Sequence, residues 1–504
     1  MDLNPLHWPS ALLQLARRPA TFAKNEVQWA VLALGDTRIP DRVQDLLVHG
    51  HQRFEHVPHE GPLVACPAVR PVGTPVAVPA DRPAELWRGG GLPRAIALSL
   101  GAAREAALTL TAAAPGTDWG VAGSESAVVS VFVDGKYNQD VVLYGGAQAT
   151  AYPLALGRLE AGEHSITLAF NQPASSPGAR AVEVSSARIE APSAGVQGLA
   201  ERYQPFFYGR DDNNHSDVPL MMWCRATREG DDTVLAYAVM HSNEDGGTGA
   251  DPVAEQASWG RQTDPDPIVT VVVGPTGTVK ETRYVGWLDE TGGFQGSYEA
   301  NHPILRVART NNSYDDRGST HLLFRPRVKV QAFAGPSRES LMDENPWTYR
   351  ISDAELRREG KLLSPSEAAA VFANSGGDRP TKVFDLRQYL YVDFSVENPG
   401  HSQIAVAVKL KGQDRWYRSD LGDPTIDPMW GGNGLRTSVP LPAGVRPADV
   451  ETVRVIDEGG KSLTLEGVNK VFMLDETFQP RYLALASGQG VRLAAHRSVD
   501  LAVR

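Results

Sequence analysis

Residues 95–192 alternate between apolar and polar positions over short stretches, as strands do when one face of a sheet is buried. The β-branched run Val128–Val133 ends at Asp134-Gly135, which is a hairpin signal, and Val141–Tyr144 is the predicted returning strand. Further strands are predicted at Ala107–Thr111, Leu154–Leu159, His164–Phe170 and Val182–Ile189. Strands at roughly ten-residue spacing predict an antiparallel β-sandwich.

The same pattern recurs in two later parts of the chain, residues 193–335 and 381–504. The strands predicted there are Leu220–Ala226, Val234–Met240, Ile268–Val273, Val279–Trp287, Ile304–Val307, Val328–Phe333, Tyr389–Val396, Ile404–Leu410, Thr452–Ile456 and Val468–Leu474. Between these parts, Ser352 and Ser364 each precede a glutamate at capping-box spacing, which predicts helices.

The predicted fold class is therefore mainly β, with several antiparallel β-sandwiches, a loop-rich central β domain and a short helical segment. A length of 504 residues fits about three domains, and 48 Gly and 36 Pro favour a loop-rich β protein. The predicted segments are an N-terminal extension with short helices and extended stretches (1–94), a jelly-roll-like β-sandwich (95–192), the central β domain with the candidate site (193–335), a helical segment and linker (336–380) and a C-terminal sandwich-like domain (381–504).

Charge and cysteine content narrow the range of partners. With 49 Lys+Arg against 60 Asp+Glu, the formal charge is −11, which argues against a protein that coats nucleic acid. No apolar run reaches the roughly 18 residues of a membrane span, and residues 1–36 lack the pattern of a signal peptide, so a cytoplasmic protein is expected by default. An exported mature chain is the alternative. Cys66 and Cys224 are predicted to be reduced thiols, and the oligomeric state stays open.

Reactive side chains gather in the loops of residues 193–335. Asp264 and Asp266 each precede a proline, which favours an extended backbone, and alternate residues of an extended segment point to the same side. Such a carboxyl pair can perform general acid and base catalysis if burial or like charge raises one pKa. The predicted catalytic residues are Asp264, Asp266, Glu244 and His241.

Neighbouring residues supply candidates for ligand binding. Trp259 would give an aromatic floor and Arg261 a cation for an anionic or sugar-like ligand, although Arg261 could equally form a surface ion pair. The predicted substrate-binding residues are Trp259, Arg261, Asn311, Asn312 and Tyr314. The ligand is expected to be a small molecule or a polysaccharide.

The same loops carry side chains that bind divalent metals. The predicted ligands are His215, Asp217, Asp245 and His302. Carboxylates alone would favour Ca²⁺, Mg²⁺ or Mn²⁺, and histidines would shift the preference toward Mn²⁺, Fe²⁺ or Zn²⁺. Loops rich in Asp and Asn also arise because these residues form turns, so a solvated or purely structural role is the alternative. No phosphate-binding or dinucleotide-binding glycine motif is present, so no nucleotide cofactor is expected.

Two stretches resemble known families. LGRLEAGEHSITLAF, residues 156–170, looks like the last hairpin of carbohydrate-binding jelly-roll modules, where aromatic residues such as Trp119 and Tyr137 could stack on sugars or pack in the core. Residues 203–325, with HSDVP, YAVMHSNEDGG, GRQTDPDP and NHPI, resemble a family of vacuolar-protein-sorting-associated proteins. The chain departs from that family where Gln262-Thr263-Asp264-Pro265 replaces a His followed by Gly-Asp-Trp-Glu. The second resemblance implies a β-rich domain and no reaction.

Two functions are compatible with these patterns. The first is a hydrolase or lyase that acts on a carbohydrate or related polyol, with or without a divalent metal. The second is a non-catalytic binding or envelope-associated protein whose loops hold structural Ca²⁺. Both depend on whether the acidic loops converge on one pocket.

Overall fold

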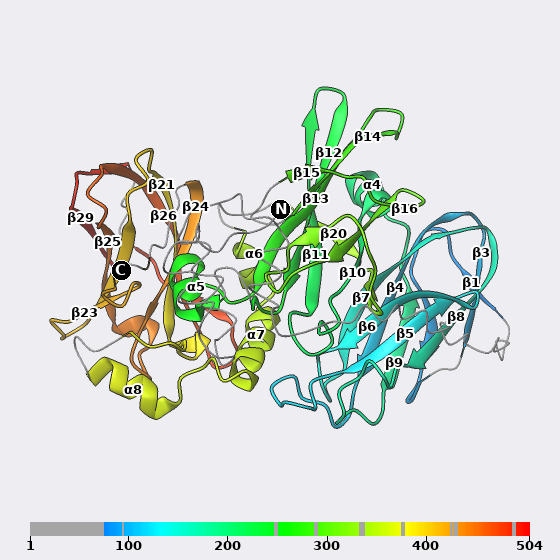
Figure 1. Ribbon diagram of the computed structural model, residues 1–504, viewed down its shortest axis with the longest axis horizontal. Helices are drawn as coiled ribbons and strands as arrows, with labels where there is room; N and C mark the ends of the chain where they lie inside the picture. The colour runs from blue at the N-terminus through cyan, green and yellow to red at the C-terminus, as the bar shows by residue number, and fades with distance from the viewer. Residues whose placement is uncertain are drawn as a thin grey trace, which may run out of the picture.

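The structure is a computed structural model that describes residues 75–92, 95–245, 250–286, 291–331, 338–373, 379–423, 426, 432–485 and 490–503 (Figure 1). The short helices predicted in the N-terminal extension, and Cys66, lie in residues 1–74, outside the described residues. Strands make up 47% and helices 13% of the structure, which confirms the mainly β fold class. None of the described helices is long and apolar enough to cross a membrane.

The first unit is a sandwich of two sheets. One has the strand order β1-β3-β8-β5-β6 and the other β2-β9-β4-β7. Their bounds are β1 Val76–Val78, β2 Ala84–Arg88, β3 Ile96–Leu100, β4 Arg104–Ala113, β5 Ala127–Val133, β6 Lys136–Leu143, β7 Thr150–Leu159, β8 Gly162–Phe170 and β9 Glu183–Ile189. The predicted hairpin is present: Val133 pairs with Lys136, and Asp134 and Gly135 both have positive φ, as the tight two-residue turn requires. β1 and β2, from the predicted extension, pair with β3 and β9 of this sandwich.

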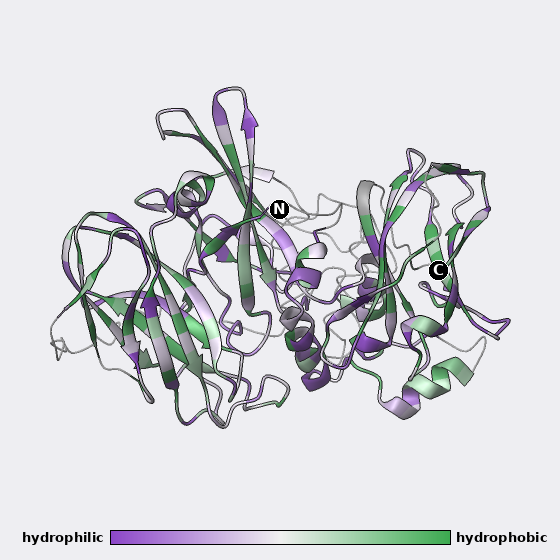
Figure 2. Cartoon of the chain, turned by 180° about the vertical axis from the view of Figure 1, so that it is seen from behind, coloured by the Kyte–Doolittle hydropathy of each residue, from purple (hydrophilic) through white to green (hydrophobic). Residues whose placement is uncertain are grey.

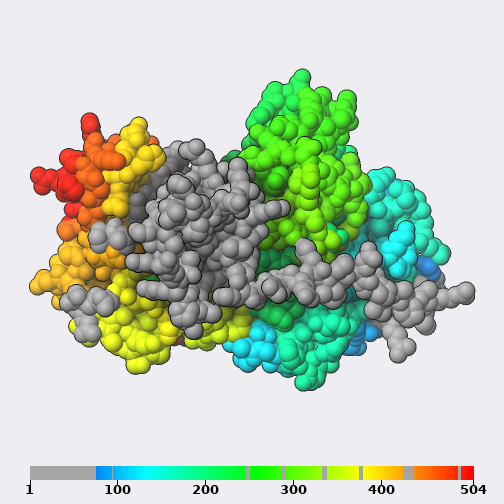
Figure 3. Space-filling model, in the orientation of Figure 1, coloured from blue at the N-terminus to red at the C-terminus, as the bar shows by residue number. Residues whose placement is uncertain are grey.

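The second unit is built on a six-stranded sheet in the order β15-β14-β13-β12-β11-β20. Its strands are β11 Pro219–Glu229, β12 Asp232–His241, β13 Asp264–Val273, β14 Val279–Val285, β15 Thr291–Gly293 and β20 Val328–Val330. The hairpins of β11–β12 and β13–β14 project from the body of the molecule (Figures 1 and 3). A smaller sheet beside it comprises β10 Phe206–Tyr208, β16 Tyr298–Glu299, β17 His302–Val307, β18 Tyr314–Asp315 and β19 Leu323–Phe324, preceded by α4 Gly195–Tyr203.

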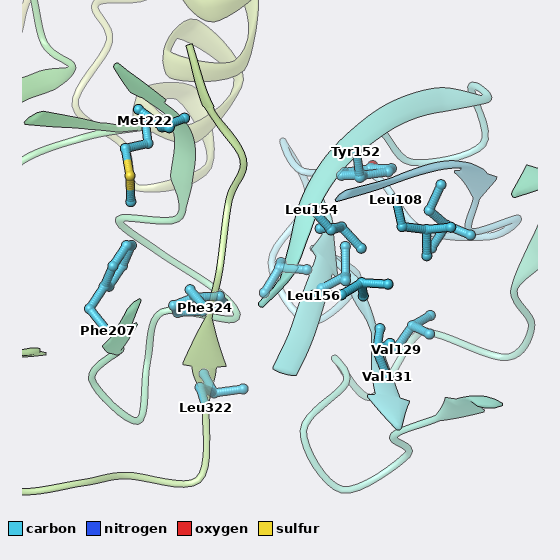
Figure 4. Close-up of a cluster of buried hydrophobic side chains, with 14 of the residues drawn as sticks. Leu108, Val129, Val131, Tyr152, Leu154, Leu156, Phe207, Met222, Leu322 and Phe324 are labelled. Carbon is cyan, nitrogen blue, oxygen red and sulfur yellow. The ribbon is translucent and has the colours of Figure 1, made fainter. Parts of the chain in front are cut away.

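One continuous apolar core joins these two units. It includes Leu108 and Val129 of the sandwich and Phe207, Met222 and Phe324 of the second unit (Figure 4). Figure 2 shows apolar positions along the strands of the sandwich and polar positions at the tips of the hairpins. The alternating burial, for example in β3, is what the sequence pattern predicts for a strand with one face in the core.

The third unit combines helices with the C-terminal sandwich. The helices are α5 Pro252–Trp259, α6 Ser340–Glu344, α7 Trp347–Arg358 and α8 Pro365–Ala373. The C-terminal strands are β21 Tyr389–Glu397, β22 Ile404–Leu410, β23 Trp416–Arg418, β24 Gly432–Pro440, β25 Val450–Asp457, β26 Leu463–Leu474, β27 Pro480–Tyr482, β28 Val491–Leu493 and β29 Ser498–Ala502. They form two sheets around a separate apolar core that includes Val392 and Val406.

The two predicted helix starts have different outcomes. At Ser364 the cap is confirmed, because the Glu367 amide donates to Ser364 Oγ (3.3 Å) and the Ser364 amide donates to Glu367 Oε2 (2.7 Å). The helix start at Ser352 is wrong, because α7 already begins at Trp347 and Ser352 lies in its buried interior. Tyr349 and Ile351 pack in the core there, so tertiary packing extends the helix beyond the local signal.

Candidate functional site

The candidate site lies where β12 ends and β13 begins. In this antiparallel pair His241 stands opposite Asp264. Asp264 and Asp266 are two residues apart in β13, so their side chains leave the same side of the strand, as the sequence predicts. Asp264 is 1% exposed, whereas the Asp266 side chain is 30% exposed. The pair therefore has one buried and one accessible member.

The two carboxyl groups have pKa values shifted in opposite directions. Burial and the charge of Asp266 raise the pKa of Asp264 well above its usual value. Burial also acts against the charged form of Asp266, but Arg338 and Arg261 outweigh it and lower the pKa of Asp266. The Arg338 Nη1 atom lies 2.7 Å from Asp266 Oδ1, and a hydrogen bond links the two carboxyl groups. Asp264 therefore keeps its proton to a higher pH than Asp266 does.

Asn312 fixes the buried member of the pair. Its Nδ2 donates to Asp264 Oδ2 (3.1 Å) and to the backbone oxygen of Asn243 (3.0 Å). Asn312 has φ +53° and is 1% exposed, a left-handed conformation that asparagine tolerates better than most residues. The other oxygen of the Asp264 carboxyl group, Oδ1, accepts no hydrogen bond from the described residues. A strained backbone and an unpaired buried oxygen at one point are typical of functional sites.

His241 and Tyr314 lie behind the pair. The Tyr314 hydroxyl is 3.4 Å from His241 Nε2, and both side chains are almost completely buried. Burial and the nearby Arg210 lower the pKa of His241 to about 3, so its ring is neutral at physiological pH. His241 is therefore a neutral and buried group here, and its predicted catalytic role stays a prediction.

Glu244 and Arg261 belong to a buried charge cluster next to the pair. Burial, followed by the charges of Glu255 and Asp264, raises the pKa of Glu244 well above its usual value. Arg261 is 3% exposed and forms ion pairs with Glu255 (2.8 Å) and Glu339 (3.2 Å). The Arg261 guanidinium therefore forms its ion pairs in the interior of the protein.

The remaining predicted substrate-binding residues lie at the edge of this cluster. Trp259 is half-buried, with its ring centroid 5.7 Å from the Arg261 guanidinium carbon. Asn311 is half-buried and its Oδ1 accepts a hydrogen bond from Ser313 Oγ (3.1 Å).

The four predicted metal ligands are not brought to one point. Asp217 pairs with Arg210 (2.5 Å) and Asp245 with Lys361 (2.5 Å). His215 Nδ1 lies 3.8 Å from Glu125 Oε2 of the first sandwich. His302 stacks on Phe206 (4.2 Å between ring centroids) in the smaller sheet and binds the backbone oxygen of Gln204 (2.9 Å). Within the described ranges, no three His, Cys, Asp or Glu side chains are placed to hold a metal ion.

A second buried carboxyl group, Glu355 of α7, connects the units around the site. It accepts hydrogen bonds from Trp119 Nε1 (3.1 Å), Ser216 Oγ (2.9 Å) and the Asp217 amide (2.9 Å). Burial and the charge of Glu359 raise its pKa to about 7. Trp119, a candidate for sugar stacking, is therefore a buried residue of the interface between units.

Several residues of the site were not found from the sequence. Arg338 and Glu339 come from the segment before α6, and Glu255 from α5, all distant from β13 along the chain. The sequence contains no local signal that these charges are buried together. The only available indication is the number of acidic residues in the loops, which requires counter-charges somewhere in the fold.

The comparisons with known proteins concern the fold only. No known protein family and no curated protein matches the chain, so the resemblance to the vacuolar-protein-sorting-associated family stays a prediction. Among solved structures, NLPPya in complex with mannosamine is 11% identical, with 28% of this chain and 74% of that chain covered and a TM-score of 0.21. The EclA C-terminal domain, a sugar-binding protein, is 17% identical (24% and 83% covered, TM-score 0.16). Necrosis and ethylene inducing protein 2 from the causal agent of cocoa's witches' broom disease is 12% identical (38% and 93% covered, TM-score 0.20).

Proposed function

We propose that the protein is a hydrolase that acts on a carbohydrate or related polyol and activates water at the Asp264–Asp266 pair. The observation that supports this reaction is the opposite shift of the two pKa values at a carboxyl pair with one accessible member. The substrate class rests on the ligand predicted from the sequence and on Trp259 and Asn311, the two predicted binding residues that stay half-buried rather than fully buried.

The contact between the two carboxyl groups favours one type of bond. Glycosidases place two carboxyl groups on opposite sides of the sugar bond, about 5–10 Å apart. Asp264 and Asp266 are hydrogen-bonded to each other, so they approach a substrate from one side. This arrangement suits attack of water on an acyl carbon, such as an ester carried by a sugar, better than displacement at a sugar ring.

In the proposed reaction, the pair holds one proton at rest and the Asp266 carboxylate takes a second proton from water. The water oxygen attacks the acyl carbon, and the proton on Asp266 passes to the alcohol oxygen that leaves, which gives an acid and an alcohol. Asp264 stays protonated, donates its hydrogen bond to Asp266 and acts as a positioning residue. Arg338 orients the other side of Asp266 through its ion pair (2.7 Å).

The test is a hydrolysis screen with acylated and unsubstituted sugars. Asp266→Asn is expected to lower kcat/KM by about 100-fold or more, because it removes the general base. Asp264→Asn keeps a donor toward Asp266 and is expected to lose less activity but to change the pH profile. Asp315→Asn, an acid in the same unit that pairs with Arg306 (2.8 Å), is the matched control and should leave activity unchanged. Equal activity of Asp266→Asn and Asp315→Asn would exclude this site assignment.

A bound divalent cation could neutralise the crowded carboxyl groups in place of a proton, and this is the basis of the alternative function. Carboxyl groups crowd here, and either protonation or a bound cation can relieve their repulsion. The non-catalytic Ca²⁺-stiffened protein is supported by the unpaired Asp264 Oδ1 atom and the crowding around Glu244. Metal analysis, with melting curves in Ca²⁺ and in chelator, separates the two proposals. A stoichiometric Ca²⁺ that raises the melting temperature, without any hydrolysis, favours the binding protein.

A further inference from the structure

A cavity of about 480 Å³ lies between the first sandwich, the central sheet and the turn that joins α6 to α7. β6 and β7 form one wall, the first residues of β11 another, and the segment before β20 a third. The cavity is separate from the Asp264–Asp266 pair, since none of the site residues lines it. Cavities of this volume at an interface between units are typical small-molecule sites, and this volume accommodates one or two sugar rings.

Aromatic rings form one side of the cavity. Tyr144 and Trp347 are parallel, with 2° between their planes and 6.0 Å between centroids, and Tyr152 meets Tyr144 edge-on at 5.2 Å. Trp347 is half-buried at the start of α7, whereas Tyr144 is buried. A flat, partly accessible indole beside tyrosines provides a surface on which the apolar face of a ring can stack.

The charge of the lining is the opposite of the charge of the chain. The chain has a net charge of −11, but the cavity is lined by Arg325, Arg327 and Lys329 against a single acid, Asp140. The Asp140 carboxylate already accepts hydrogen bonds from Ser130 (2.6 Å) and from Tyr137.

The three cations differ in whether they already form an ion pair within the protein. Arg325 is paired with Glu299 (2.5 Å) and Arg327 with Glu201 (2.8 Å). Lys329 is exposed and, within the described part of the chain, forms no ion pair. A ligand anion can therefore bind Lys329 without displacing a carboxylate of the protein.

A buried acceptor in the lining has no partner. Gln139 is completely buried, and its Nε2 donates to Asn138 Oδ1 (2.9 Å) and to the backbone oxygen of Ala155 (2.8 Å). Its Oε1 has no hydrogen-bond donor among the described residues. An unsatisfied buried acceptor is costly, so the wall of the cavity carries an uncompensated polar atom at this point.

We infer that this cavity binds an acidic sugar of the uronate type, with its carboxylate against Lys329 and its ring against Trp347. This inference deepens the proposed function, because it makes the polyol an anionic one. The cavity would hold such a unit of a longer substrate or of a separate ligand, away from the Asp264–Asp266 pair.

Isothermal titration of the full chain with D-galacturonate and D-galactose tests this inference. Saturable binding of galacturonate is expected, about tenfold or more tighter than galactose, because only the acid forms the charge-assisted contact with Lys329. Lys329→Gln should reduce galacturonate affinity to that of galactose. Lys136→Gln removes an equal charge from an exposed position of β6 outside the cavity and should change nothing. Trp347→Leu should weaken both sugars.

Two results would overturn the inference: no saturable binding of galacturonate, or equal loss of affinity in Lys329→Gln and Lys136→Gln. Lys329 is exposed, so its variant folds even if Trp347→Leu does not. The titration is repeated with Asp266→Asn. Suppose that galacturonate still binds to the Asp266→Asn variant, and that the unmodified chain hydrolyses no substrate in the screen. The hydrolase proposal then fails, and the proposal of an acidic-sugar site remains.

Discussion

Two buried charge clusters of this molecule contrast with each other. Around Arg436 of β24, every guanidinium nitrogen has partners: Asp393 at 2.6 and 2.9 Å, Asp343 at 2.7 and 3.0 Å and the Tyr349 hydroxyl at 2.9 Å. Around Asp264, one oxygen of the carboxyl group accepts no hydrogen bond from the described residues, and the pKa values of Asp264 and Asp266 are shifted in opposite directions.

The contrast separates a network that holds the fold together from one that we propose to be reactive. The Arg436 cluster joins α6 and α7 to the C-terminal sandwich with balanced charges and complete hydrogen bonding, which holds these elements in one arrangement. The Asp264 cluster has an excess of acid, a left-handed residue, Asn312, and an accessible carboxylate. Burial alone therefore does not mark a functional group. The informative sign is a buried charge whose partners are incomplete.

Removal of Arg436 should give the largest effect on stability. Arg436→Leu leaves Asp393 buried without its ion-pair partner and Asp343 with only Lys470 (3.1 Å), and it is expected to lower the free energy of unfolding by about 3–5 kcal/mol. Chemical denaturation followed by fluorescence measures this. Arg446→Leu is the control in the same domain, because Arg446 is exposed and its ion pair with Asp449 is screened by water and contributes little to stability. Equal losses in both variants would contradict the account of a saturated network.

The two aspartates should affect the pH dependence of stability with opposite signs. The folded state holds a proton on Asp264 that the unfolded chain releases above pH 3.8, so wild-type stability falls as pH rises from there toward the raised pKa. The Asp264→Asn variant has no ionisable group at this position, so its stability does not fall with pH for this reason. The difference in melting temperature between the variant and the wild type should therefore grow in favour of the variant from pH 4 to pH 7.

Asp266 has the opposite linkage. Its folded-state pKa is lowered, so its ionised form stabilises the fold above pH 3.8 and this contribution disappears in acid. Asp266→Asn should therefore be less stable than wild type at pH 7, with a difference that shrinks as pH falls below 3.8. The measurement is the melting temperature of both variants as a function of pH, from below pH 3.8 to pH 7. If the melting temperatures of Asp264→Asn and Asp266→Asn changed with pH in the same way, the assignment of the two pKa shifts would be wrong.

The smallest expected effect is a shift in the acid limb of the pH–rate profile. Arg338 lowers the pKa of Asp266 through a 2.7 Å ion pair, and its side chain is 32% exposed. Arg338→Gln should move the acid limb of the pH–rate profile upward by about one pH unit, with little change at the plateau. An unchanged acid limb would mean that Asp266 is not the group whose ionisation permits turnover.

The sequence predicted those features that depend on local spacing. The two-residue turn at Asp134-Gly135 and the cap at Ser364 follow from the residues themselves. Asp264 and Asp266 could be paired for the same reason, because each lies before a proline in an extended strand. The strand alternation likewise gave the fold class, since a period of two needs only a buried and an exposed face.

Features that depend on long-range contacts could not be predicted. Arg261 looks like a surface cation in the sequence, but Glu255 and Glu339 enclose it from other segments. His241 lies in β12 of the six-stranded sheet and His302 in β17 of the smaller sheet. The sequence shows that both are histidines in the same part of the chain, but it does not show that they belong to different sheets. The raised pKa of Asp264 results from burial and nearby charge, which only the folded arrangement determines.

The central claim is that Asp264 is protonated and Asp266 ionised at neutral pH. ¹³C NMR of the chain labelled at its aspartate carboxyl carbons tests this most directly, with Asp264→Asn and Asp266→Asn used to assign the two signals. The account predicts that the Asp264 signal keeps the chemical shift of a carboxylic acid at pH 7, whereas the Asp266 signal has that of a carboxylate. Two carboxylate signals at pH 7, both titrating near pH 4, would contradict it.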